Sequence, residues 1–186
     1  QINMKTRFIL HGGFKKGGKQ ENDDFFKEVL NTAPGEVKIL LVYFAKELDR
    51  ISKNKDEDIE QFDKNRGNRI LTFEIAVEDL FSEQVKNADV VYLHGGHPGK
   101  LLEALKRHPN LGELFKGKIV AGDSAGASIL SSAFYSSKIG VAEGFGIIPI
   151  KIICHYTEEN KDELNHVKPD LEKVLLREYQ YRIFYQ

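Results

Sequence analysis

The sequence predicts an α/β fold with a doubly wound, mostly parallel sheet that is flanked by helices. Two observations predict it. Short runs of aliphatic and β-branched residues alternate with longer amphipathic runs along the 186 residues, and glycine-rich or reactive residues follow directly after several apolar runs. Such alternation is typical of βαβ units, whose working groups gather at the carboxyl ends of the strands. This length suits one domain, so residues 1–186 are interpreted as a single domain.

The elements follow one another in a regular order. Strands are expected where apolar runs are short and bounded by turn residues, at Arg7–His11, Val37–Phe44, Arg69–Phe73, Asp89–Leu93, Lys118–Ala121, Ile147–Cys154 and Tyr179–Tyr185. Helices are expected where apolar residues recur at helical spacing, at Asp23–Asn31, Lys46–Arg66, Glu78–Asn87, Ala125–Phe134 and Asp170–Glu178, with a further helix beginning near Pro98. The helix at Lys46–Arg66 has few apolar residues and is predicted to be exposed to solvent.

Composition and charge exclude several classes of function. The net charge of −1 gives no basic field for nucleic acid or for an anionic membrane surface. A single cysteine, Cys154, fits a reducing compartment, and no apolar run approaches the ~20 residues that span a bilayer. We therefore expect a cytoplasmic protein, a monomer or homodimer, without nucleic-acid or membrane partners. Gln1–Asn3 precede the only methionine, Met4, and are interpreted as residues left by cloning.

The segment Gly122-Asp123-Ser124-Ala125-Gly126 lies between a predicted strand and a predicted helix. Gly-x-Ser-x-Gly in that context is the nucleophile-elbow pattern, in which a tight turn exposes a reactive hydroxyl at the edge of the sheet. The alternative is a simple βα turn with Ser124 as a helix cap. We interpret Ser124 as a catalytic nucleophile and the backbone N–H of Ala125 as an oxyanion donor.

A serine nucleophile needs a base, and His155 is the candidate because it ends the next long apolar run. We expect the ends of the two strands to be neighbours in one sheet, since adjacent strands lie about 4.8 Å apart. A second oxyanion donor is expected from His94-Gly95-Gly96-His97, at Gly96, although the same residues fit an ordinary turn before a helix that begins at Pro98.

These segments together resemble the peptidase E (aspartyl dipeptidase) and cyanophycinase family of serine peptidases. The match rests on Ala121–Ala127 as the nucleophile turn, on Val91–Leu102 as the glycine-rich segment, and on Gly144–Pro149 followed by His155-Tyr156. Order and spacing agree over roughly residues 5–165. The resemblance implies a flavodoxin-like, class I glutamine-amidotransferase-like fold.

The resemblance also implies an activity, which is hydrolysis of short peptides with an acidic N-terminal residue by Ser124 and His155, without metal or other cofactor. Gly96 and Ala125 would form the oxyanion hole, and Gly95 and His97 would border the substrate. The family's acidic residue shortly after the nucleophile helix has no counterpart in Ser136-Ser137-Lys138. Candidates for the third catalytic member are therefore Glu143, Glu158 and Glu159, and a Ser–His dyad is the alternative.

Other functions are alternatives to this interpretation. A carboxylesterase of the α/β-hydrolase type needs an acid and then a histidine well after the serine, and the chain is short for that order. A catalytically silent binding or regulatory domain on the same fold remains the main alternative. Residues 13–20 approach a P-loop but lack its final hydroxyl, which favours a basic loop. Cys154 is interpreted as a core residue.

Overall fold

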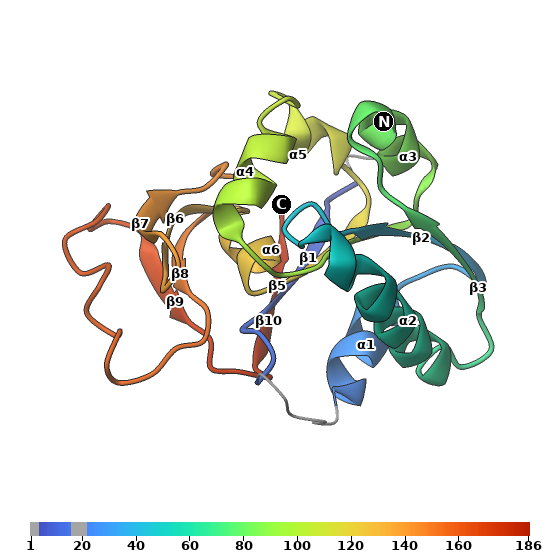
Figure 1. The fold of residues 1–186 in the computed structure, drawn as a ribbon, viewed down its shortest axis with the longest axis horizontal. Coiled ribbons are helices and arrows are strands. Elements are labelled where there is room, and N and C mark those ends of the chain that lie inside the picture. Colours follow the sequence, from blue (N-terminus) through green and yellow to red (C-terminus); the bar gives the residue numbers. More distant parts are fainter. Residues whose placement is uncertain (1–3, 16–21) are drawn as a thin grey trace.

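The computed structural model describes residues 4–15 and 22–186, folded around two β-sheets (Figure 1). Residues 1–3 and 16–21 lie outside the described part, and with them most of the expected basic loop. Within the described part, no helix has the length and apolar character needed to cross a membrane.

The main sheet has six strands. Their order across the sheet is β10 (Tyr181–Tyr185), β1 (Arg7–His11), β5 (Ile119–Asp123), β4 (Val90–Leu93), β2 (Glu36–Val42) and β3 (Ile70–Ile75). Every pair is parallel except β1 with β10. The predicted α/β class with a mostly parallel sheet is confirmed. The four inner strands are apolar on both faces, as expected when helices cover both sides.

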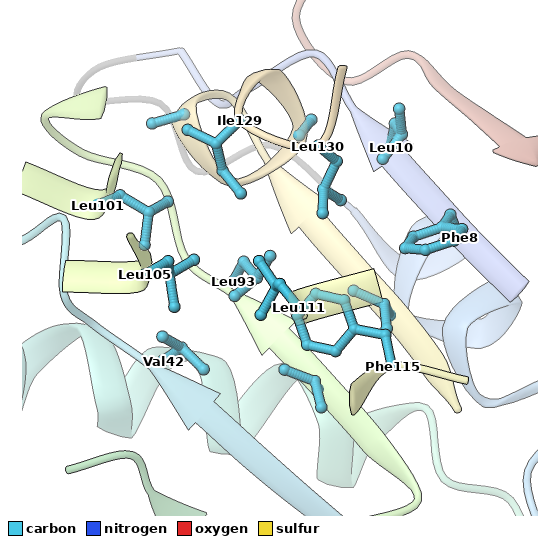
Figure 2. Packing of buried hydrophobic residues seen from close by; sticks show 14 of the residues in the cluster. Phe8, Leu10, Val42, Leu93, Leu101, Leu105, Leu111, Phe115, Ile129 and Leu130 are labelled. Atoms are coloured by element: carbon cyan, nitrogen blue, oxygen red, sulfur yellow. The ribbon is translucent and has the colours of Figure 1, made fainter. Parts of the chain in front are cut away.

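Helices cover both faces of this sheet. One face packs against α1 (Asp23–Leu30) and α2 (Leu48–Lys64). The other packs against α3 (Phe81–Asn87), α4 (Pro98–Leu105), α5 (Leu111–Leu114) and α6 (Ala125–Ser128), with a single 3₁₀ turn at Glu78–Leu80 before α3. Side chains alternate accordingly along β1, where Phe8 and Leu10 join one core and Ile9 the other. Figure 2 shows the core under α4 and α5, where each buried Leu or Phe contributes about 1.5–3 kcal/mol.

A second sheet corrects two expectations. It contains β7 (Gly140–Glu143), β6 (Ser131–Ser136), β8 (Ile148–Ile153) and β9 (Glu172–Leu175), in that order, and lies beside the main sheet (Figure 1). The expected helix at Ala125–Phe134 ends at Ser128, because the following serine and aromatic residues pair with β7 and β8 instead. The expected helix at Asp170–Glu178 is wrong as well, since Val174 is buried opposite Ile152 in β8.

Candidate active site

Ser124 occupies a strained turn between β5 and α6. Its backbone has φ 50° and ψ −111°, a region that residues with a side chain rarely adopt. Its N–H donates to the carbonyl of His11 at 3.0 Å, which ties the turn to β1. A Cβ at Gly126 would lie 2.0 Å from the carbonyl oxygen of Leu93, so only glycine allows the helix to begin this close to β4. The local geometry is that of a nucleophile elbow.

His155 lies against Ser124, with 3.0 Å between its Nε2 and the serine Oγ. The strand before His155 does not lie in the expected sheet. His155 follows β8, which belongs to the second sheet. The two residues do not come from neighbouring strands of one sheet. Instead the N–H of His155 donates to the carbonyl of Gly12 at 2.8 Å, which docks the second sheet on the end of β1. His155 also has a positive φ of 50°, so both members of the pair sit on constrained backbone.

The carboxylate that contacts His155 is Glu178. Its Oε1 lies 3.0 Å from the histidine Nδ1, and Glu178 follows β9 in the segment that leads to β10. Glu178 is not among the predicted carboxylates, because residues 170–178 were expected to form a helix. A signal was present, since Val174–Leu176 is an apolar run directly before Arg177 and Glu178, and strand ends carry functional groups in this class of fold.

None of the three expected carboxylates contacts His155 in the described part of the chain. Glu143 pairs with Lys168 at 3.5 Å. Glu158 accepts a hydrogen bond from the hydroxyl of Tyr156 at 2.9 Å, and Glu159 is exposed. The geometry therefore supports a Ser–His–Glu arrangement through Glu178 rather than through these residues.

The loop after β4 approaches the serine. The N–H of Gly95 donates to Oδ1 of Asp123 at 2.8 Å. Within the described residues, no acceptor takes the N–H of Gly96 or of Ala125. The role of both groups as oxyanion donors therefore stays a prediction. Nζ of Lys138, from the turn between β6 and β7, donates to the carbonyl of Gly96 at 3.0 Å and brings a cation to this loop.

His97 caps α4. Its Nδ1 accepts the N–H groups of Gly99 at 3.1 Å and Lys100 at 3.4 Å, and Pro98 occupies the first helical position. The turn-before-a-helix interpretation is thus correct for His97, while Gly95 borders the serine, since a Cβ at Gly95 would lie 3.2 Å from the Cβ of Ser124. In the described ranges, no three or more His, Cys, Asp or Glu side chains gather in a group that could hold a metal ion.

Comparison with known proteins identifies the family. The profile of peptidase family S51 matches residues 8–179. The chain belongs to this family. It is a serine peptidase, as the resemblance to peptidase E implied, and the carboxylesterase alternative is wrong. Among curated proteins, no sequence matches it significantly.

Two solved structures share its fold. One is a peptidase from an acI-B1 actinobacterium, with 23% identity and a TM-score of 0.66 over 99% of this chain and 85% of that one. The other is a putative peptidase E protein from Listeria monocytogenes EGD-e, with 13% identity and a TM-score of 0.64 over 98% of both chains.

Cys154 is a core residue of this peptidase. Its side chain is buried, Oγ of Ser128 donates to its Sγ at 3.6 Å, and burial raises the pKa of the thiol to about 12. Because the thiolate is the reactive form, iodoacetamide at mildly alkaline pH is expected to leave the peptidase activity unchanged. Intact-mass spectrometry beside the activity assay checks this, and inactivation in step with modification of Cys154 would contradict it.

Gly13 lies directly against the imidazole ring of His155. A Cβ at Gly13 would lie 2.3 Å from Nε2 of His155, and the residue has φ +107°. Its N–H donates to Nδ1 of the buried His11 at 3.0 Å. Burial lowers the pKa of His11 despite the opposing carboxylate of Asp123, which favours the neutral ring that can accept this bond.

Gly13→Ala is expected to displace the His155 ring and to lower kcat by about 100-fold, because misplacing a catalytic group by about 1 Å costs that much. The matched control is Gly140→Ala, which has a similar unfavourable φ of +74° but no atom within 4 Å of the added methyl group. Measured kcat and melting temperature separate the effects. Equal kcat in the two variants would show that the contact with His155 is unimportant.

Proposed function

We propose that this peptidase hydrolyses short peptides through a covalent acyl-enzyme on Ser124. One observation carries the proposal: hydrogen bonds join Ser124, His155 and Glu178 in series, with 3.0 Å between the interacting atoms at both steps. A nucleophile, a base and a group that orients the base are the parts that acyl transfer by serine hydrolases requires.

In the first step, Nε2 of His155 takes the proton of the Ser124 hydroxyl while Oγ attacks the peptide carbonyl. The carboxylate of Glu178 accepts the Nδ1–H, which keeps Nε2 unprotonated and stabilises the imidazolium that forms. The imidazolium then protonates the leaving amine. A water molecule, deprotonated by the same histidine, hydrolyses the ester and restores Ser124.

The negative charge of the tetrahedral intermediate falls, in this proposal, between the N–H groups of Gly96 and Ala125. Two observations support this assignment. Neither N–H has an acceptor among the described residues, and Gly96 follows Gly95, whose N–H donates to Asp123. Preorganised donors of this kind act where charge develops, and losing one typically costs on the order of 10² to 10³ in rate.

We further propose substrates with an acidic N-terminal residue, bordered by the loop that contains Gly95 and His97. The resemblance to peptidase E supports this preference.

A panel of dipeptides tests the proposal. Asp-X and Glu-X are compared with their uncharged counterparts Asn-X and Gln-X, and a fluorophosphonate probe is mapped by peptide mass spectrometry. We expect turnover, faster for the acidic substrates, and probe attached to Ser124. Turnover that is equal for acidic and amide substrates would contradict the preference alone. No turnover and no labelling would instead favour a catalytically silent binding domain.

A further inference from the structure

A buried polar cluster adjoins the loop His94–His97, which contains the proposed oxyanion donor Gly96, and is not part of the Ser–His–Glu arrangement. It consists of Tyr43 at the end of β2, Asp58 on α2 and His94 at the end of β4. Oδ2 of Asp58 accepts hydrogen bonds from the hydroxyl of Tyr43 and from Nδ1 of His94, both at 2.7 Å. The exposed fractions of Asp58 and His94 are only 4% and 7%.

Asp58 differs from the other acidic residues of α2 because its side chain is buried. The other acidic side chains of α2 are exposed, and its sequence predicts a solvent-facing element. Burying a carboxylate costs free energy unless close partners compensate. The two short hydrogen bonds supply those partners, and the one to His94 leads toward the active site, since His94 directly precedes Gly95 and Gly96.

A second buried carboxylate, that of Asp123, holds the same loop through the backbone. Oδ1 of Asp123 accepts the N–H of Gly95 at 2.8 Å and the hydroxyl of Tyr92 at 3.0 Å. Asp123 directly precedes Ser124 in the chain. Asp123, which precedes the nucleophile, is therefore joined by one hydrogen bond to the peptide group between His94 and Gly95.

The charges of the cluster match this arrangement. Burial alone would lower the pKa of His94, but the carboxylates of Asp123 and Asp58 outweigh both burial and the nearby Lys46, and the net effect raises it. The hydrogen bond of 2.7 Å between Nδ1 of His94 and Oδ2 of Asp58 fixes the direction of the ring. His94 is thereby held in one orientation, and its backbone continues directly into the glycines.

We infer that Asp58 and His94 are positioning residues that fix the peptide groups of Gly95 and Gly96 for the oxyanion. Neither side chain touches the reacting atoms. The inference rests on the proposed serine-peptidase mechanism, in which the N–H of Gly96 binds the charge that develops in the transition state. Groups fixed in advance need no reorganisation during the reaction, so loosening this loop should affect the transition state more than substrate binding.

The test compares Asp58→Asn with Asp56→Asn, a control on an exposed residue of the same helix. We expect Asp58→Asn to lower kcat by about 10- to 100-fold with KM nearly unchanged. The affinity for a peptidyl trifluoromethyl ketone, which forms an oxyanion on the serine, should fall by a similar factor. Tyr43→Phe removes one hydrogen bond to Asp58 and keeps the ring, so it should lower kcat and ketone affinity by a smaller factor. This variant replaces Asp58→Asn in the test if Asp58→Asn does not fold.

Hydrogen exchange gives a readout that does not need activity. Amide exchange in the segment 94–97 should be faster in Asp58→Asn than in the wild type and in Asp56→Asn. If the wild type hydrolyses peptides but both Asp58→Asn and Tyr43→Phe keep its kcat, ketone affinity and exchange, the inference is wrong and the proposed function stands. If the wild type itself hydrolyses no peptide, the proposed function fails, and unchanged exchange in Asp58→Asn would still overturn the positioning role.

Discussion

Ser124→Ala is expected to lose peptide hydrolysis by about 10⁴- to 10⁶-fold while keeping its fold and its substrate affinity. The hydroxyl is the only part of the side chain that the change removes, and the acyl-enzyme cannot form without it. The strained turn is set by the backbone, through the bond from the Ser124 N–H to the His11 carbonyl and the close approach of Gly126 to β4. Alanine can occupy that turn as well as serine does.

Ser128→Ala is the matched control, because Ser128 lies four residues away on α6, is buried and directs its hydroxyl to the sulfur of Cys154. Its kcat should stay close to that of the wild type. Initial rates on the best dipeptide, together with melting temperatures, compare the three proteins. Residual hydrolysis by Ser124→Ala within about tenfold of the wild type would exclude the acyl-enzyme mechanism, since the remaining groups alone do not sustain such rates.

The part of the site that lies on the main sheet could be predicted from local sequence patterns. The elbow at Ser124 and the glycines after β4 follow strands whose apolar runs are unambiguous, and parallel strands bring their carboxyl ends to one edge. The meeting of Gly95 with Asp123 is a direct consequence of that topology. Sequence and structure agree there because short-range pattern and long-range pairing demand the same arrangement.

The second sheet could not be read from the sequence in the same way. Residues 125–134 contain helix-favouring alanines and then serine and aromatic residues, and the point where the helix stops depends on strands much later in the chain. Residues 170–178 carry enough leucine, lysine and glutamate to favour a helix in isolation. Tertiary pairing with β8 outweighs that propensity, and Glu178 reaches His155 only through this pairing.

The burial of Asp58 depends on tertiary structure for the same reason. A charged residue in a charged helix is expected on the solvent side. Its spacing of four residues from the buried Phe62 is the one local hint that it faces inward. The partner that makes its burial tolerable, His94, lies 36 positions later in the chain.

Glu178→Gln is expected to lower kcat by about 10² to 10⁴, and nearer the lower figure. A glutamine keeps the shape of the side chain, but it carries no charge to stabilise the imidazolium and its amide can present N–H to Nδ1, which favours the wrong tautomer of His155. The side chains of Glu178 and His155 are 38% and 42% exposed, so water screens part of the loss. KM should change little, because the carboxylate contacts the base rather than the substrate.

Glu158→Gln is the control for this change, because Glu158 lies close in sequence to His155 yet bonds to Tyr156, Lys161 and Arg177. Steady-state kinetics on one dipeptide, with Glu178→Asp as a conservative variant, measure the effect. If Glu158→Gln rather than Glu178→Gln loses activity, the acidic member is the residue expected from the sequence. If neither does, the enzyme works as a Ser–His dyad, and Glu178 only joins the segment before β10 to the second sheet.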